Sequence, residues 1–139
     1  MNGFLTYKTH PFLWIGLGLF ALLSSGCSSS RDTASKPGRV QHIVLCWLKE
    51  PGNEESHTSL IEATFNLRSI PGVLRVHAGT PLASDRPIVD DSFDVGIIIV
   101  LENREALQPY LDHPTHTEAV REILAPLTER ILIYDVLEE

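Results

Sequence analysis

Residues 97–101 read Ile-Ile-Ile-Val-Leu, an unbroken apolar run. The runs Ile-Val-Leu-Cys-Trp-Leu at 43–48 and Ile-Leu-Ile-Tyr at 131–134 have the same character. Short runs rich in β-branched and large apolar residues predict β-strands. A strand that is apolar on both of its faces needs cover on both sides. These three segments therefore predict a sheet whose two faces are both buried.

The segments around these runs predict the element order β-α-β-β-α-β. An apolar stripe marks the first helix, which has an acidic start and which Pro71-Gly72 ends. In the next segment Leu74, Val76 and Ala78 alternate with polar or small residues, which indicates an edge strand with one wet face. The predicted elements are strand 40–48, helix 54–68, strand 74–79, loop 81–92, strand 93–101, helical pieces 103–112 and 115–124, and strand 131–137.

The second helical region should be interrupted. Asn103 can cap its first piece, and Pro109 inside that piece should bend it, because proline removes a backbone hydrogen bond. Pro114 ends the piece, and Thr115 and Glu118 have the spacing of a capping box that opens a second piece.

This order is that of the ferredoxin-like α+β fold. Two helical regions cover only one face of a four-stranded sheet, so the other face must meet a second subunit. The sequence therefore predicts a homodimer joined sheet to sheet.

The first 26 residues predict an export signal. The apolar run at 11–23 is too short for a bilayer core of ~30 Å, which takes about 20 residues, and it has the length of a signal-peptide core. It ends in Leu23-Ser24-Ser25-Gly26-Cys27, which resembles a bacterial lipobox, with Ser24 where leucine is usual. We expect residues 1–26 to be a lipoprotein signal peptide, with Cys27 as the acylated first residue.

The segment after the lipobox is small and polar, so residues 27–39 predict a lipid-anchored flexible tether and residues 40–139 the folded domain. Ser28, in place of aspartate, resembles the sorting signal for the outer membrane. We expect the protein in the cell envelope, on the outer membrane and facing the periplasm.

Composition argues against other partners. The chain carries 11 Lys and Arg against 18 Asp and Glu, a formal net charge of −7. Nucleic-acid binding and docking on anionic lipid both need clustered basic residues, so we expect neither. With Cys27 carrying lipid, Cys46 has no partner within the chain, and its apolar strand predicts a buried, unreactive thiol.

Three short motifs follow one another along the chain: Val40-Gln41-His42-Ile43-Val44-Leu45, Ile70-Pro71-Gly72-Val73 and Tyr110-Leu111-Asp112-His113-Pro114-Thr115-His116. Together they resemble the stress-responsive A/B barrel (Dabb) domain, over residues 39–138. The resemblance implies a ferredoxin-like monomer that dimerises into an α+β barrel. It also implies site residues, since a plant polyketide cyclase shares the fold. The Tyr and second His that act on its substrate fall on Tyr110 and His116. Its strand-one His falls on His42, whereas a further pocket His falls on Val95.

His116 and Tyr110 are the candidate catalytic residues. A histidine at the start of a helix is disfavoured as imidazolium by the helix dipole, so a neutral ring that accepts a proton is expected at His116. The phenol of Tyr110 would polarise a carbonyl group. The alternatives are a His116 that braces the bend after Pro114 and a Tyr110 that fills the core. His42 either joins them in a ligand-binding pocket or lies in the subunit interface.

No metal site and no cofactor are predicted. His113 and His116 with Asp112 suggest metal ligands, but the intervening proline prevents a same-face helical pair, and no second ligand cluster exists. We expect His113 to satisfy backbone groups or to face solvent.

The sequence thus predicts an exported, lipid-anchored, dimeric α+β barrel protein. It would bind a small, mostly apolar ligand between sheet and helices, at His42, Tyr110 and His116. Acid–base chemistry there would use His116 as base and Tyr110 as carbonyl partner. One alternative is a non-catalytic stress or envelope module that acts through protein contacts. Another is a cofactor-free or haem-degrading barrel monooxygenase, for which the sequence has no haem-ligand signature.

Overall fold

The computed structural model describes residues 38–139. The predicted signal peptide, Cys27 and the tether as far as residue 37 lie outside the described residues, and those predictions stay predictions. None of the described helices is long and apolar enough to cross a membrane.

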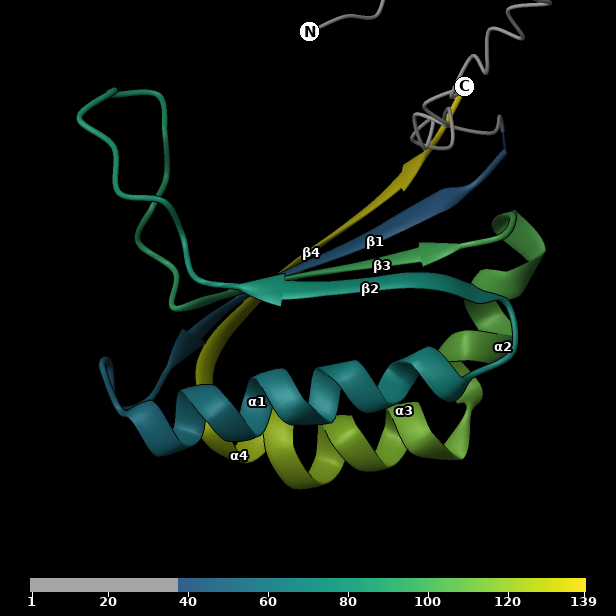
Figure 1. The fold of residues 1–139 in the computed structure, drawn as a ribbon, viewed down its shortest axis with the longest axis horizontal. Coiled ribbons are helices and arrows are strands. Elements are labelled where there is room, and N and C mark those ends of the chain that lie inside the picture. Colours follow the sequence, from purple (N-terminus) through teal and green to yellow (C-terminus); the bar gives the residue numbers. More distant parts are fainter. Residues whose placement is uncertain (1–37) are drawn as a thin grey trace, which may run out of the picture. The chain divides into compact units, whose positions relative to one another are not determined.

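The described chain forms one antiparallel sheet with helices on one side (Figure 1). The strands are β1 (Val40–Leu48), β2 (Val73–Gly79), β3 (Val95–Leu101) and β4 (Thr128–Leu137), in the order β2-β3-β1-β4. The helical elements are α1 (Glu54–Asn66), η1 (Leu67–Ser69), η2 (Arg104–Ala106), α2 (Leu107–Asp112), α3 (Pro114–Ala119), the π-helical η3 (Val120–Leu124) and α4 (Ala125–Leu127). The predicted ferredoxin-like α+β order is confirmed.

α1 is fixed at both ends by local signals. The Asn53 side chain accepts a 2.9 Å hydrogen bond from the backbone N–H of Ser56, which caps the first turn. After η1 the chain turns at Gly72, whose φ of +84° favours glycine. A Cβ at Gly72 would also lie 3.1 Å from the Cβ of Ala106, so this turn brings β2 close to η2.

The second helical region differs from the prediction in its details. Asn103 caps η2, as expected, by accepting from the N–H of Ala106. Pro109 is the third residue of α2, which follows η2 directly, and the bend expected there stays a prediction. The capping box at Thr115 is wrong. α3 begins at Pro114, and His113 is its N-cap, its Nδ1 accepting from the N–H of Thr115 at 3.2 Å.

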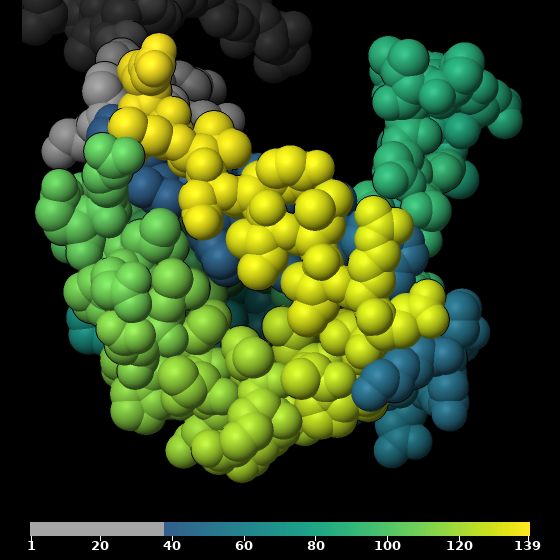
Figure 2. All heavy atoms as spheres, turned by 180° about the vertical axis from the view of Figure 1, so that it is seen from behind, coloured from purple at the N-terminus to yellow at the C-terminus, as the bar shows by residue number. Residues whose placement is uncertain are grey.

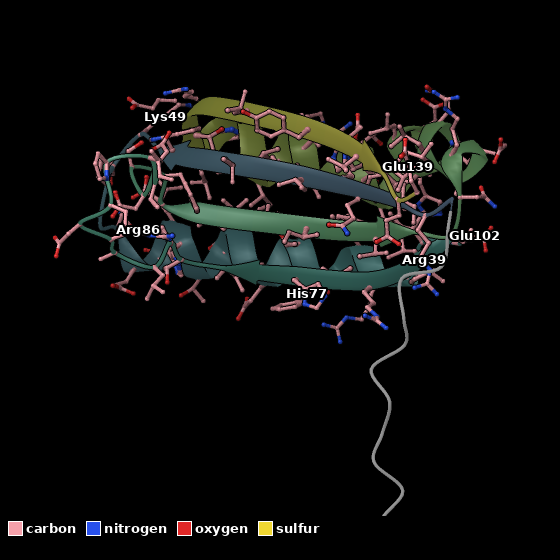
Figure 3. The ribbon with its side chains drawn as sticks, turned by 90° about the horizontal axis from the view of Figure 1, so that it is seen from above. Arg39, Lys49, His77, Arg86, Glu102 and Glu139 are labelled. Carbon is pink, nitrogen blue, oxygen red and sulfur yellow. The ribbon has the colours of Figure 1, made fainter. Side chains whose placement is uncertain are left out.

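The two faces of the sheet are buried to different degrees. On β3, Val95, Ile97, Ile99 and Leu101 face the helices and are each 5% exposed or less. The residues between them, such as Ile98 and Val100, are only half-buried. All the described helices lie against the first face, so the second face, viewed in Figure 3, has no cover from residues 38–139. We call it the open face.

β2 is an edge strand, as predicted, but its first residues do not alternate. The pairing of β2 with β3 shifts between Val73 and Arg75, which leaves Leu74 as an extra residue. Leu74 is 46% exposed, so its predicted place on one apolar face with Val76 and Ala78 is wrong.

The core side of β3 yields a stability prediction. Ile99 is fully buried, and Ile99→Ala should lower the free energy of unfolding by about 2–5 kcal/mol, whereas Ile99→Val should cost about 0.5–1.5 kcal/mol. The measurement is urea unfolding at one fixed protein concentration. Glu62→Ala, on the exposed side of α1, is the surface control and should change little. Equal losses for Ile99→Ala and Glu62→Ala would contradict this description of the core.

Candidate functional site

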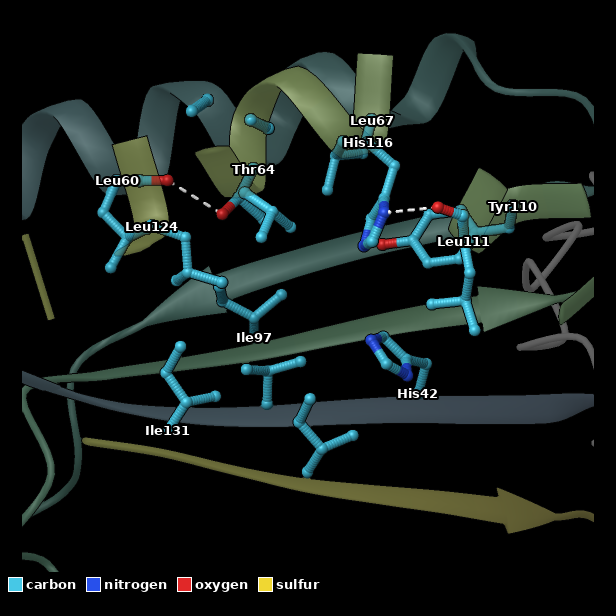
Figure 4. A pocket seen from close by; sticks show the side chains of 15 residues that line it. His42, Leu60, Thr64, Leu67, Ile97, Tyr110, Leu111, His116, Leu124 and Ile131 are labelled. Atoms are coloured by element: carbon cyan, nitrogen blue, oxygen red, sulfur yellow. Dashed lines mark hydrogen bonds between the residues drawn. The ribbon is translucent and has the colours of Figure 1, made fainter. Parts of the chain in front are cut away.

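A pocket of about 240 Å³ lies between the sheet and the helical layer. Figure 2 shows its mouth as a hollow between β4 and the helices that precede it. At one end its walls are aliphatic, with Leu60, Ile97, Leu124 and Ile131 (Figure 4). The polar side chains of the lining are His42, Thr64, Tyr110 and His116. Such a mainly apolar cavity with a few convergent polar groups is the usual form of a small-molecule site.

The three predicted site residues come together at the other end of this pocket (Figure 4). His42 comes from β1, Tyr110 from α2 and His116 from α3. The ring centroids of His42 and Tyr110 are 5.6 Å apart, and those of Tyr110 and His116 are 4.7 Å apart. The sequence separates these residues by up to 74 positions, and the fold makes them neighbours.

The His116 ring is held by the backbone of the preceding helix. It is the third residue of α3, not the first as predicted. Its Nδ1 lies 2.9 Å from the carbonyl oxygen of Leu111, which can only accept, so Nδ1 carries the proton and donates. Nε2 is then the unprotonated nitrogen. Burial lowers the pKa of His116 below its usual 6.5, nearby His42 lowers it further, and the Leu111 hydrogen bond works in the opposite direction. The expected neutral ring follows, with burial as the main cause.

Tyr110 stays a phenol. The residue is 1% exposed, and burial, helped by the Asp135 carboxylate, raises its pKa far above the usual 10.0. In Figure 4 the phenol oxygen points at the His116 ring. A protonated hydroxyl in this position can donate a hydrogen bond to a ligand oxygen.

Asp135 is a site residue that the sequence interpretation missed. Its Oδ1 lies 2.7 Å from Nδ1 of His42, and the two residues are direct cross-strand partners. The side chain of His42 is 5% exposed and that of Asp135 is 44% exposed. The carboxylate accepts from Nδ1–H, so Nε2 is the ring nitrogen of His42 that is left to face a ligand. The signal was present in the sequence as one acid within the otherwise apolar run from 131 to 137.

The neighbouring candidates lie elsewhere. His113 caps α3 with its side chain, which agrees with the backbone role expected of it. Cys46 is fully buried, and burial raises the pKa of its thiol to about 11, so it is unreactive as predicted. Val95, to which the resemblance assigned a further pocket His, is 0% exposed within the core. Across residues 38–139, no three His, Cys, Asp or Glu side chains are grouped to hold a metal ion.

Residues 40–137 match the family described as the stress responsive A/B barrel domain. The chain belongs to the stress-responsive A/B barrel (Dabb) domain family. The match confirms the family resemblance of the three motifs. None of the curated proteins matches the chain.

Solved structures share the fold of this Dabb domain. A Dabb family protein of Mesorhizobium loti with a ferredoxin-like fold is 26% identical, with a TM-score of 0.60 over 73% of this chain and 98% of that chain. A dimeric ferredoxin-like protein of unknown function from Thermobifida fusca is 20% identical, with a TM-score of 0.59 over 73% and 92%. A hydroxynitrile lyase from Passiflora edulis is 21% identical, with a TM-score of 0.65 over 75% and 96%.

The two less similar structures establish the fold alone. The comparison covers 98% of the Mesorhizobium loti chain, so that Dabb family protein folds with little beyond this domain. Residues 38–139 contain the hydrophobic core that the structure describes and are the unit for the experiments below.

The lowered pKa of His116 predicts a pH dependence of stability. The neutral ring is favoured in the folded state, so its contribution is fully present above the unfolded pKa of about 6.5 and is lost as pH falls through the lower folded pKa. Wild type should therefore lose stability relative to His116→Gln as pH falls from 8 to 5.

Urea unfolding at each pH measures this difference, with His113→Asn as the control, because asparagine preserves the N-cap. A wild-type advantage that grows toward pH 5 would contradict the assigned environment of His116.

Proposed function

We propose that the protein binds a small, mostly apolar molecule that carries an oxygen atom, and that His116 and Tyr110 perform acid–base chemistry on it. One observation carries the proposal: a phenol and two imidazoles, each with an available donor or acceptor, converge at one end of an otherwise apolar pocket. The aliphatic end would hold the apolar part of the ligand, and the polar end its oxygen.

The chemistry would be proton transfer next to a carbonyl group. The hydroxyl of Tyr110 donates a hydrogen bond to the carbonyl oxygen. Nε2 of His116 then takes a proton from the adjacent carbon, whose electron pair moves toward that oxygen and forms an enolate. Return of the proton from His116 regenerates the carbonyl compound. His116 can accept this proton without breaking a hydrogen bond, because its Nδ1–H continues to donate to the carbonyl oxygen of Leu111.

His42 would position Tyr110 and the ligand. Its ring meets that of Tyr110 edge to face, and the Asp135 carboxylate fixes its orientation through Nδ1. The Passiflora hydroxynitrile lyase is a lyase on a similar fold. At its level of identity it supports only the statement that such a fold can host an enzyme.

The homodimer is part of the proposal. The open face carries apolar residues of all three central runs, including Ile43, Ile98 and Leu132, and residues 38–139 provide no cover for them. Solved relatives of this fold are dimeric. A second subunit against this face would complete the α+β barrel.

The alternative is a non-catalytic envelope module that acts through protein contacts. The exposed apolar residues on β4, such as Tyr134 and Val136, favour contact with a protein. A pocket filled by the protein's own side chains would favour this alternative further. The cavity of about 240 Å³ supports ligand binding instead.

Deuterium exchange tests the acid–base proposal. Residues 38–139 are incubated in D₂O with phenylacetone or 2-heptanone as probes, and NMR follows exchange at the carbon next to the carbonyl. Wild type should accelerate exchange over buffer. His116→Ala should abolish the acceleration, and Tyr110→Phe should lower it about 10²-fold or more.

His113→Asn is the matched control and should retain exchange, because it removes a nearby imidazole while preserving the cap of α3. Sedimentation of His116→Ala should still show the dimer, and loss of the dimer would instead indicate a bracing role. Exchange by wild type at the buffer rate would contradict the proposed chemistry.

We propose further that the mature protein begins at Cys27 and is held by lipid on the outer membrane, facing the periplasm. The full chain, expressed in a diderm bacterium with an alkyne-labelled fatty acid, should incorporate the label, and Cys27→Ser should abolish incorporation. Mass spectrometry should find no peptide from residues 1–26 in the membrane-bound form. A full-length product that retains these residues, without label, would contradict the anchor.

A further inference from the structure

A long arm joins β2 to β3 and leaves the body of the molecule. It comprises residues 80–94, and we call it the arm. Figure 1 shows it rising from the sheet on the side away from the helices, and Figure 3, which looks onto the open face, places it at one end of the strands. Figure 2 shows its tip standing apart from the other described residues. A subunit stacked on the open face would therefore lie beside the arm.

The base of the arm is anchored to the sheet. Nε1 of Trp47 donates to the hydroxyl of Ser92 at 3.1 Å, and the Trp47 ring packs edge to face on Phe93. The guanidinium of Arg130 covers the Trp47 ring, 4.0 Å from its centroid. The carboxylate of Asp94 accepts from the backbone N–H of Leu48 at 2.8 Å. Elements β1 and β4 thus fix the direction in which the arm leaves.

The arm also has internal bonds. The carboxylate of Asp91 accepts from the N–H of Ser84 at 2.9 Å, which ties its two limbs together. The N–H of Val89 donates to the carbonyl oxygen of Arg86 at 3.0 Å, which closes a turn near the tip. These hydrogen bonds give the arm a defined conformation.

The arm presents two large apolar side chains to solvent. Leu82 is 88% exposed and Ile88 is 90% exposed, the highest values among the large apolar residues of the described chain. The other exposed large apolar residues are Leu74 and five on β4: Ile131, Ile133, Tyr134, Val136 and Leu137. Of these, Ile131 and Ile133 line the pocket, whereas Tyr134 and Val136 lie on the open face. Exposed apolar side chains on the arm and on the open face suit an interface in which each meets the other on a second copy.

The dimensions fit such a contact. Each limb of the arm has about seven residues and spans at most ~25 Å, whereas stacked sheets lie ~10 Å apart. The tip can therefore pass the whole thickness of a partner's sheet.

The far end of the sheet, where β1 begins and β4 ends, complements the arm. There Arg39, Arg75 and His77 line a depression on the open face. Its one acid, Glu138, accepts a hydrogen bond from the side chain of Gln41, so the two arginines give the depression a net positive charge. Tyr134 and Val136 lie on the same face, since they pair with Ile43 and Gln41 of β1. The arm carries four acids against one basic residue, Arg86. Asp94 is bonded to the N–H of Leu48, and the other three are Asp85, Asp90 and Asp91. Charge and apolar character both match the arm to the far end, not to a second arm.

We propose that each subunit's arm clasps the far end of the partner's sheet, in a two-fold dimer whose stacked sheets run in opposite directions. Leu82 and Ile88 pack against the C-terminal half of the partner's β4, and the acids of the arm face the partner's basic depression. The clasp rests on the homodimer proposed above and specifies its orientation.

Disulfide trapping tests this orientation. In residues 38–139 the only native cysteine is Cys46, which is buried and unreactive. The double variant Ile88→Cys/Val136→Cys, oxidised with copper phenanthroline, should give a covalent dimer on a non-reducing gel. Neither single variant should do so. A covalent dimer of Ile88→Cys alone would place the two arms together and overturn the clasp, as would failure of the double variant to cross-link.

Affinity gives a second, independent readout. Leu82→Ser/Ile88→Ser should raise the dimer dissociation constant at least tenfold in sedimentation equilibrium, whereas Ala83→Ser on the same arm should not change it. If wild type is a dimer and the double serine variant has the same dissociation constant, the clasp is overturned but the homodimer proposal is not. A monomeric wild type overturns both, and the deuterium-exchange assay then still decides the pocket chemistry. A third outcome is that the protein floats with phosphatidylcholine vesicles only when Leu82 and Ile88 are present, while the dimer dissociation constant stays the same. That outcome would show that these side chains bind lipid and would overturn the clasp.

Discussion

The rest of the molecule depends on the unequal cover of one sheet. The helices seal one face, where Val95, Ile99 and Leu101 are fully buried, and the opposite face carries further apolar residues without cover from the described chain. Burial of apolar surface is the main favourable term in folding, so the open face favours association with a second surface. The stacked dimer that we propose, and the contact of the arm with a partner, both start from this asymmetry.

The same asymmetry creates the pocket. β4 is an edge strand whose helix side is incompletely covered, so Ile131 and Ile133 stay exposed and line a cavity. Its polar end is ordered because buried polar groups need partners. Leu111 and Asp135 each accept from Nδ1–H of a ring, which leaves Nε2 of His116 and Nε2 of His42 for a ligand. The bonds that satisfy these rings also prepare them to receive a ligand.

Much of this was predictable from sequence, and the misses have physical reasons. Apolar runs fixed β1, β3 and β4, because strand composition follows burial. The grouping of His42, Tyr110 and His116 came from family resemblance, since nothing local brings such distant residues together. Asp135 was missed because its role depends on its register with His42, which the sequence does not state. The errors at Thr115 and Leu74 concern a helix start and a strand irregularity, where a shift by one residue changes which side chain serves as a cap or faces the core.

The central claim is a dimer whose pocket holds a small molecule, and native mass spectrometry tests it most directly. Residues 38–139, purified gently from a cell extract, should be detected as a dimer with a small extra mass that is lost on collisional activation. The released mass would give the class of ligand. A monomer at the bare mass of the chain would contradict both the use of the open face and the occupied pocket.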